Sequence, residues 1–379
     1  MILGRRAVLG SLFACTFVFA ADGTRTKESV LAQAAQPTIQ ADIPSLCATL
    51  AADFPVGAAI WRGDIAGPHS ELLKKHFNSI TAENDMKWEY VEPAEGNFTF
   101  GAADALVAFA KANHMLVRGH NLAWHRQNPK WLFEDAAGNE LQLTPENKAL
   151  LLRRLQNYIR AVVSHFGDDI YAWDVVNEVI DPDQLDGFRR SPWLLLTGAD
   201  YIDTAFRTAR EVAPHAKLYI NDYDTTDPRK RAFLLALVKG LQSRGVPIDG
   251  VGHQMHINLN RPSTSEIAET IRMFSALGVD NQITELDVSV YDHADQRYDA
   301  APEALLVKQG YRYEELFDTF RQLKGKITAV TFWGLADDHT WLTEFPVSRQ
   351  DWPLLFDAQL QAKLAYWGIV DPQRLPQKN

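Results

Sequence analysis

Short runs of β-branched and aromatic residues alternate along this chain with longer amphipathic stretches of helical periodicity. The short runs predict eight strands, at residues 56–60, 77–83, 115–122, 171–179, 218–223, 250–257, 282–290 and 327–335. The amphipathic stretches predict helices between them, for example at residues 102–112, 145–166, 200–212, 228–244 and 265–277. Strands and helices are therefore expected to alternate through most of the chain.

This alternation predicts an α/β fold with a parallel sheet. Eight strand–helix units in a chain of this length favour a single eight-stranded TIM barrel with an outer ring of helices. An open, doubly wound sheet is the alternative. It is disfavoured because residues 57–59, Gly-Ala-Ala, lack the G-x-G-x-x-G spacing of a phosphate-binding turn after the first strand.

The first twenty residues are typical of an export signal peptide. Arg5 and Arg6 precede an uncharged apolar run at residues 7–20, which ends in a small-residue cleavage motif. A second such motif ends at Ala34, so the signal could extend to residue 34, and the paired arginines resemble a twin-arginine signal. The run is too short to span a bilayer as a helix. We therefore expect an exported protein, periplasmic or secreted, with no membrane anchor in its mature form.

The rest of the chain is predicted to form one domain. Residues 21–43 are polar and alanine-rich without periodicity and predict a loosely ordered leader. Residues 44–371 form the predicted barrel, and residues 372–379 a short tail. Removal of the signal would leave Cys47 as the single cysteine, which excludes a disulfide within the mature chain. We expect a monomer.

Composition narrows the possible ligands. Lys and Arg number 38 against 48 Asp and Glu, a formal net charge of −10, so the chain lacks the basic excess that phosphate binding requires, and nucleic acid is not an expected partner. The chain also has 10 Trp, 11 Tyr and 19 Phe residues, which either fill a core or stack on flat ligands and sugar rings. Composition alone does not choose between those two uses.

Function in a TIM barrel collects at the carboxyl ends of the strands. Polar clusters lie at several predicted strand ends, at residues 81–88, 118–125, 173–178, 253–256, 284–287 and 332–334. Two clusters present a glutamate directly after an apolar run, Glu178 and Glu285. One such glutamate would more often bind an arginine or cap a helix. Two facing carboxylates, however, are what glycoside hydrolysis requires, and a buried carboxylate is costly unless it is paired or used.

The histidines give little support to a metal site. His253 and His256 are three residues apart, which places them on opposite faces of an extended strand. His120 and His125 also lack the spacing of a helical zinc motif. A glycine-rich loop ending in Lys-Ser or Lys-Thr, which would bind nucleotide phosphates, is absent from the sequence. We expect neither a metal nor a cofactor.

Side-chain alternation also predicts a contact between two strand ends. Gln254 and His256 share one face of their strand, and Glu285 and Asp287 share one face of the next. This arrangement allows Asp287 to orient His256, and His256 to contact Glu285.

Other candidates have two interpretations each. Glu83 and Lys87 are four residues apart, which predicts a surface ion pair on a helix, or sugar-binding groups if they lie on the barrel rim. Trp124, Trp333 and Trp341 follow strand ends and are predicted to stack on sugar. Six other tryptophans are expected mostly in the core: Trp88, Trp131, Trp173, Trp193, Trp352 and Trp367.

Five ordered motifs resemble those of glycoside hydrolase family 10, the family of retaining endo-β-1,4-xylanases. They are FNSITAENDMKW at residues 77–88, RGHNLAWH at 118–125, WDVVNE at 173–178, ITELD at 283–287 and WGL at 333–335. The resemblance runs from about Asp53 to Asp371. It implies the eight-stranded barrel and a substrate of xylan or xylo-oligosaccharide.

The resemblance also implies roles for single residues. Glu178 would be the general acid/base, Glu285 the nucleophile, and Asn177 would bind the hydroxyl next to the anomeric carbon. The sugar subsites on the non-reducing side would be lined by Glu83, Asn84, Lys87, His120, Trp124, Gln254, His256, Trp333 and Trp341. Asp287 would support His256.

Two departures from the family pattern bear on subsite shape and substrate preference. His253 stands where small or apolar residues are commoner, and residues 337–341, Asp-Asp-His-Thr-Trp, vary the usual approach to the last tryptophan. Two other functions stay open. One is a sugar-binding protein without catalysis, which the intact glutamate pair disfavours. The other is an enzyme for another β-linked glucan, whose hydroxymethyl group must fit beside Trp333 and Trp341.

Overall fold

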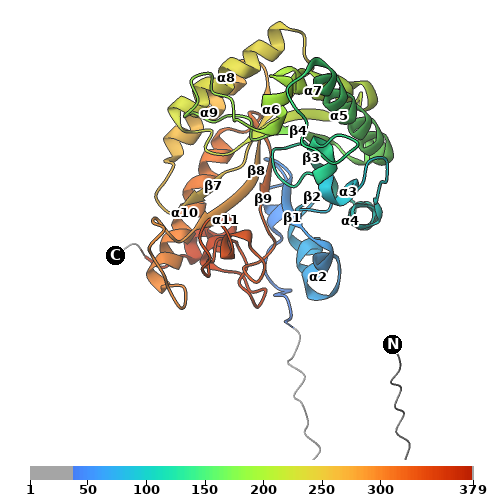
Figure 1. The fold of residues 1–379 in the computed structure, drawn as a ribbon. Helices are drawn as coiled ribbons and strands as arrows, with labels where there is room; N and C mark the ends of the chain where they lie inside the picture. Colours follow the sequence, from blue (N-terminus) through green and yellow to red (C-terminus); the bar gives the residue numbers. More distant parts are fainter. Residues whose placement is uncertain (1–36, 378–379) are drawn as a thin grey trace, which may run out of the picture. The chain divides into compact units, whose positions relative to one another are not determined.

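The computed structural model describes residues 37–377. Eight parallel strands form the barrel, in the order β1 (Val56–Ile60), β2 (Ser79–Ala82), β3 (Leu116–Ala123), β4 (Ala172–Asn177), β5 (Lys217–Asp222), β6 (Gly250–His253), β8 (Asp280–Ser289) and β9 (Ile327–Phe332). β6 pairs directly with β8, and β9 pairs with β1, so the sheet closes on itself. The predicted single TIM barrel is confirmed (Figure 1).

The sixth predicted strand, residues 250–257, is wrong as one continuous strand. It breaks into β6 and the short strand β7 (His256–Asn258), because Met255 has a φ of 59°, outside the extended region. β6 pairs with both β5 and β8, whereas β7 pairs only with β8, where His256 lies opposite Asp287. The break therefore carries His256 away from the barrel ladder and places it beside the end of β8.

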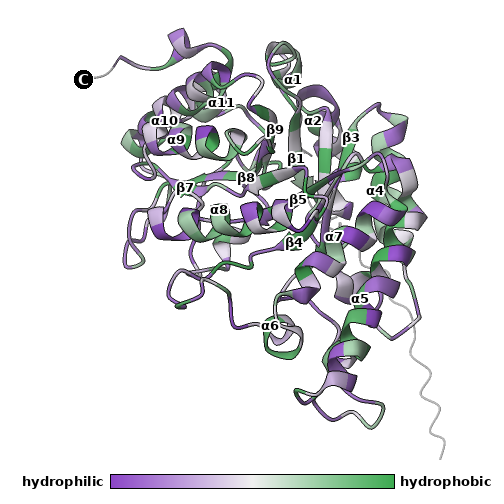
Figure 2. Cartoon of the chain, turned by 90° about the horizontal axis from the view of Figure 1, so that it is seen from above, coloured by the Kyte–Doolittle hydropathy of each residue, from purple (hydrophilic) through white to green (hydrophobic). Residues whose placement is uncertain are grey.

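Helices surround the strands, as both ribbon views show (Figures 1 and 2). The longer ones are α2 (Gly67–His76), α4 (Gly101–Ala112), α5 (Pro145–Phe166), α7 (Asp200–Val212), α8 (Pro228–Ser243), α9 (Thr264–Ser275) and α10 (Glu303–Gln322). Shorter ones are α1 (Leu46–Thr49), α3 (Trp88–Val91), α6 (Pro192–Thr197) and α11 (Leu364–Val370). The side chains of Thr144 and Asp227 cap α5 and α8 directly before the prolines that begin them, so the start of each helix is encoded locally.

The core contains most of the tryptophans that the sequence assigned to it. Trp173 is fully buried within the barrel wall, and Trp88 and Trp193 are nearly so. Trp88 stacks on Tyr158 of α5 with ring centroids 3.8 Å apart. Trp367 is also buried, whereas Trp131 and Trp352 are partly buried against the same core.

The two ends of the described range are attached to the barrel. Near the start, the Gln361 side chain donates to the Thr38 carbonyl oxygen at 2.9 Å, and Lys75 donates to the Ala41 carbonyl oxygen at 2.8 Å. Near the other end, the Arg374 guanidinium lies 3.4 Å from the centroid of the Trp367 ring. The predicted signal peptide and the leader up to residue 36 lie outside the described residues. Between residues 37 and 377, no helix is long and apolar enough to cross a membrane.

Gly119 in β3 is required by the packing of Trp173, and this requirement can be tested. A Cβ atom at Gly119 would lie 2.2 Å from the Trp173 ring, whereas one at Gly101, the first residue of α4, would meet open space. We expect Gly119→Ala to lower the free energy of unfolding by about 1–3 kcal/mol through overpacking. Gly101→Ala, the matched control, should leave it unchanged or slightly higher. Equal melting temperatures for both variants would contradict this account.

Candidate active site

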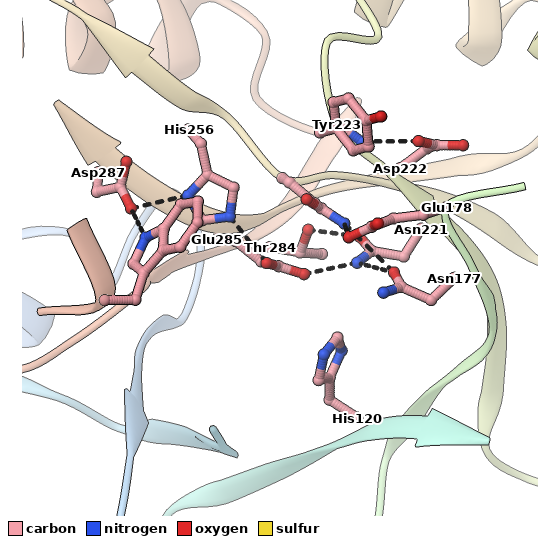
Figure 3. Close-up of polar contacts among 12 residues, drawn as sticks. His120, Asn177, Glu178, Asn221, Asp222, Tyr223, His256, Thr284, Glu285 and Asp287 are labelled. Carbon is pink, nitrogen blue, oxygen red and sulfur yellow. Dashed lines mark hydrogen bonds and ion pairs between the residues drawn. The ribbon is translucent and has the colours of Figure 1, made fainter. Parts of the chain in front are cut away.

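The predicted site residues gather at the carboxyl ends of the strands, as Figure 3 shows. Glu178 directly follows β4, and Glu285 lies within β8. Asn221, near the end of β5, lies between the two and contacts both of them. Its carbonyl oxygen accepts from the Glu178 N–H, and its side chain donates to Glu285. Two glutamates that are 107 positions apart in the sequence are thus brought to one rim.

Glu285 is held as a carboxylate by donors on both of its oxygens. Asn221 Nδ2 donates to Oε1 at 2.7 Å, and His256 Nε2 lies 3.0 Å from Oε2. Burial alone would raise the pKa of Glu285. The hydrogen bond from His256, the nearby histidine charges and the Asn221 amide outweigh burial, so the pKa is lowered from its ordinary value.

His256 is the positively charged member of a relay. Its Nδ1 lies 2.7 Å from Asp287 Oδ2, and its Nε2 faces Glu285. Burial lowers the pKa of His256, but Asp287 and Glu285 raise it by more than burial lowers it, and the resulting pKa is about 10. Trp341 Nε1 donates to the same Asp287 oxygen at 2.8 Å, which fixes the carboxylate. The contact predicted from side-chain alternation, Asp287 to His256 to Glu285, is confirmed.

Glu178 has the opposite electrostatic environment. Its pKa is raised, chiefly by burial and then by the negative charges of Asp222 and Glu285. Gln254 Nε2 donates to Glu178 Oε1 at 3.2 Å, and the Glu178 N–H donates to the Asn221 carbonyl oxygen at 2.8 Å. Glu178 also has a φ of 57°, a left-handed conformation that is costly for this residue type and that often marks a functional position. The two glutamates are therefore biased toward opposite protonation states.

Amide side chains link the two glutamates. The Asn177 amide lies 2.9 Å from Asn221 Nδ2, the group that also donates to Glu285. Thr284 Oγ1 donates to Asn221 Oδ1 at 2.6 Å, which orients the amide. A Cβ atom at Gly252 would lie 2.3 Å from Asn221 Oδ1, so the glycine leaves room for it. Asn221 and Thr284 were not among the predicted site residues, although Asn221 belongs to a polar strand end that could have indicated it.

His120 lies below the glutamates, on β3 (Figure 3). Its Nδ1 is 2.9 Å from Asp174 Oδ2, and the other Asp174 oxygen accepts from Arg118 at 2.6 Å. Trp333 packs edge-on against His120 and against His256, with ring centroids 5.2 and 6.2 Å away. The charge of His120 contributes to the lowered pKa of Glu285.

A second polar group lies on the rim after β2. Lys87 Nζ donates to Asn84 Oδ1 at 3.0 Å and lies 4.9 Å from the centroid of the Trp124 ring. Burial lowers the pKa of Lys87 to about 8, although Glu285, Glu83 and Glu178 oppose this shift. Glu83 contacts His339 instead, with Oε2 and Nε2 3.0 Å apart. Both residues therefore lie at the rim without forming the alternative Glu83–Lys87 ion pair, and their binding of sugar stays a prediction.

Several further residues adjoin the site. Gln127 Nε2 donates to Asn84 Oδ1 at 3.0 Å, and His125 Nδ1 lies 3.8 Å from Glu178 Oε2. Beyond Glu178, Tyr223 follows β5 and accepts a hydrogen bond from Arg189 at 2.5 Å (Figure 3). None of these four residues was a predicted sugar-binding residue: all of them lie in the loops that follow β3, β4 and β5, beyond the strands themselves.

His253 has no part in this group, contrary to the expectation that it bears on subsite shape. It is fully buried beneath the rim, where its Nδ1 and Nε2 lie 2.8 Å from Thr225 Oγ1 and 3.0 Å from Asn281 Oδ1. Burial lowers its pKa to about 4, so it is a neutral core histidine. Among residues 37–377, no group of three or more His, Cys, Asp or Glu side chains is placed to hold a metal ion.

Two carboxylates at facing strand ends of a TIM barrel, one with its pKa raised and the other lowered, are the arrangement of a glycoside hydrolase. The family model described as glycosyl hydrolase family 10 matches residues 45–372. The chain belongs to this family.

Characterised relatives cover most of the chain. A thermostable celloxylanase from Thermoclostridium stercorarium is 50% identical over 88% of this chain and 89% of its own length. Endo-1,4-beta-xylanase B from Paenibacillus barcinonensis is 46% identical over 87% of this chain and 98% of its own length. The crystal structure of xylanase B from Clostridium stercorarium F9 has a TM-score of 0.85 at 50% identity, covering 87% of this chain and all of that one.

The charge on His256 predicts a pH dependence of stability. Its folded-state pKa of about 10 lies above the value of roughly 6.5 for an unfolded histidine. The stabilisation that it contributes is therefore fully present below about pH 6.5 and is lost as the pH rises through about 10. Asp287→Asn removes the largest charge that raises this pKa, so His256 should titrate at lower pH in the variant.

Histidine ring titration by NMR, together with denaturant unfolding between pH 6 and roughly 10, would measure both effects. His253 is an internal control, since it should remain neutral over this range in both proteins. Titration of wild-type His256 near the ordinary value would contradict the relay.

Proposed function

We propose that this protein is an endo-1,4-β-xylanase that cleaves xylan by retaining double displacement, with Glu178 as general acid/base and Glu285 as nucleophile. The observation that carries the proposal is that the pKa values of the two glutamates are shifted in opposite directions. Hydrogen bonds hold the pKa of Glu285 low, while burial and nearby negative charge raise that of Glu178. One carboxylate is thereby available to attack while the other keeps its proton.

In the first step, Glu285 attacks the anomeric carbon and Glu178 donates its proton to the leaving glycosidic oxygen. The bond from the anomeric carbon to that oxygen breaks, and an ester bond to Glu285 forms. His256 and Asn221 need not move during this step, because each already contacts one of the two Glu285 oxygens. Only the strength of their hydrogen bonds to Glu285 changes. Such preorganised donors need no rearrangement during the reaction.

In the second step, Glu178 acts as a base. Esterification removes the negative charge of Glu285, one of the causes that raise the pKa of Glu178. The pKa of Glu178 then falls, and the carboxylate can take a proton from water as the water attacks the anomeric carbon. Cleavage of the ester releases the sugar with its original configuration and restores both glutamates.

Substrate binding is assigned to the non-reducing side of the cleaved bond, and Asn177 would bind the hydroxyl next to the anomeric carbon. The residues that would contact sugars on this side are Glu83, Asn84, Lys87, His120, Trp124, Gln254, His256, Trp333 and Trp341. Polar side chains of this kind bind hydroxyl groups, and indole rings stack on the apolar face of a sugar. No metal or other cofactor takes part in the scheme.

The names of the relatives support a xylose-based substrate. Two mutants of the intracellular xylanase from Thermoanaerobacterium saccharolyticum, 42% identical with a TM-score of 0.80, were solved with xylotriose and xylotetraose. The word celloxylanase in the name of another relative also favours a test on cellulose. We propose xylan and xylo-oligosaccharides as the substrates of this chain.

Variants of the two glutamates test the mechanism. Glu285→Ala should abolish release of reducing sugar from xylan. Glu178→Ala should slow it by roughly 10²–10⁴-fold, and less for aryl glycosides whose leaving group needs no proton. Glu303→Ala, an exposed glutamate in the first turn of α10, is the matched control and should retain full activity. Proton NMR of the first product should show retained β-configuration, which corresponds to carboxyl groups about 5–5.5 Å apart.

The same assays separate the alternatives. Preferential release from carboxymethylcellulose would identify an enzyme for another β-glucan, and binding without release from either polymer would identify a sugar-binding protein. A product with inverted configuration would contradict the nucleophile assignment of Glu285.

We also propose that the protein is exported, from the signal predicted at residues 1–20. Expression of the full chain in a Gram-negative host should yield a periplasmic or secreted protein whose first residue is Ala21, or Ala35 if the later site is used. Replacement of Arg5 and Arg6 by lysine should block export only if the twin-arginine route is used. A cytoplasmic product that retains Met1 would contradict the proposal.

A further inference from the structure

Trp61 is an exposed indole on the rim that the proposed mechanism does not use. It directly follows β1, and 45% of its surface is exposed. β1 pairs with β2, which leads into Glu83, and with β9, which leads into the loop carrying His339. Side chains from three adjacent strands therefore meet at this point of the rim.

Contacts on several sides hold the indole in position. Its ring stacks on the His339 ring with centroids 5.4 Å apart and an interplanar angle of 27°. A Cβ atom at Gly63 would lie 2.2 Å from the indole, so the ring lies close over this glycine. The Trp61 backbone N–H donates to Asp64 Oδ2 at 3.1 Å. A large aromatic surface that is both exposed and fixed loses little conformational freedom when a ligand packs on it.

His339 connects the indole to the proposed substrate-binding residues. Its Nε2 lies 3.0 Å from Glu83 Oε2, and this hydrogen bond raises the pKa of His339. The neighbouring Asp338 pairs with His69 of α2 at 2.7 Å, which ties the loop after β9 to the segment after β1. The unusual residues before Trp341 thus belong to this part of the rim.

Exposure increases outward from the glutamate pair along these residues. Lys87 lies near Glu285, and only 6% of its surface is exposed. The Glu83 side chain is 15% exposed. The fraction rises to 49% for the His339 side chain and 45% for Trp61. A substrate chain that runs outward from the glutamate pair past Glu83 would therefore next meet His339 and Trp61.

We propose that Trp61, positioned by His339, forms a further subsite that binds a third xylose unit on the non-reducing side of the cleaved bond. The inference rests on the proposed function, since the direction of the chain comes from the roles assigned to Glu285 and Glu83. The ligand is a neutral sugar. An exposed indole stacks on the apolar face of a sugar ring, and the neighbouring carboxylates of Glu83 and Asp338 are already paired with His339 and His69.

Two aryl glycosides with the same leaving group test the subsite. 4-Nitrophenyl β-xylobioside and β-xylotrioside differ only in the third sugar, so the ratio of their kcat/KM values measures what that sugar contributes. Trp61→Ala should lower kcat/KM for the trioside by roughly three- to tenfold, the size of one aromatic contact, and leave the bioside unchanged. Trp61→Tyr should retain most of the wild-type ratio.

Met273→Ala is the matched control, because Met273 is an exposed apolar residue on the outer helix α9. Its ratio should equal that of the wild type. An unchanged ratio in Trp61→Ala, or an equal loss on both glycosides, would overturn the subsite.

If the proposed function is wrong, the wild type would hydrolyse neither glycoside, which differs from a failure of the subsite alone. In that case calorimetric binding of xylopentaose is the test. Trp61→Ala should still weaken binding several-fold if the subsite exists, and equal affinity would overturn it.

Discussion

The hydrogen-bonded relay from Asp287 through His256 to Glu285 is the interaction on which the rest of the site depends. Ionising two neighbouring carboxylates costs free energy, because their negative charges repel each other. The surrounding groups therefore determine which carboxyl group keeps its proton. A positively charged His256, itself stabilised by Asp287, stabilises the ionised form of Glu285. Glu178, partly buried beside that negative charge and that of Asp222, then holds its proton more tightly.

The barrel supplies this relay through a local irregularity. A continuous sixth strand would have kept the chain in the ladder between β5 and β8, but the turn at Met255 transfers it to β8 alone. His256 then lies opposite Asp287 in register, at hydrogen-bonding distance. Glu178 likewise has a left-handed backbone conformation directly after its strand. Departures from regular geometry thus occur where side chains must be redirected, which is where strain is expected at a functional site.

Strand periodicity predicted much of this arrangement. Alternation along β8, where Glu285 and Asp287 share a face, was enough to suggest a contact of both with His256, and the position of polar residues at strand ends was enough to select Glu178 and Glu285. The same reasoning overlooked Asn221 and Trp61. Asn221 on β5 contacts Glu285 on β8 across the intervening strand β6, where Gly252 leaves room for its side chain, and the position of Trp61 depends on the pairing of β1 with β9. Both relations join residues distant in sequence, and no local pattern records them.

The sequence by itself determined the order of strands and helices, the eight-stranded barrel and the identity of the two glutamates, because these follow from short-range periodicity and from residue types at element ends. Only the tertiary structure decided which glutamate is ionised, since the pKa values depend on burial and on charges contributed by other strands. It also decided the place of His253, which forms part of the core rather than the sugar site because its ring packs against Phe274 of the outer helix α9. Solvent exposure and pKa depend on three-dimensional packing. They therefore differ between residues of the same type, as they do between Glu178 and Glu285 and between His253 and His256.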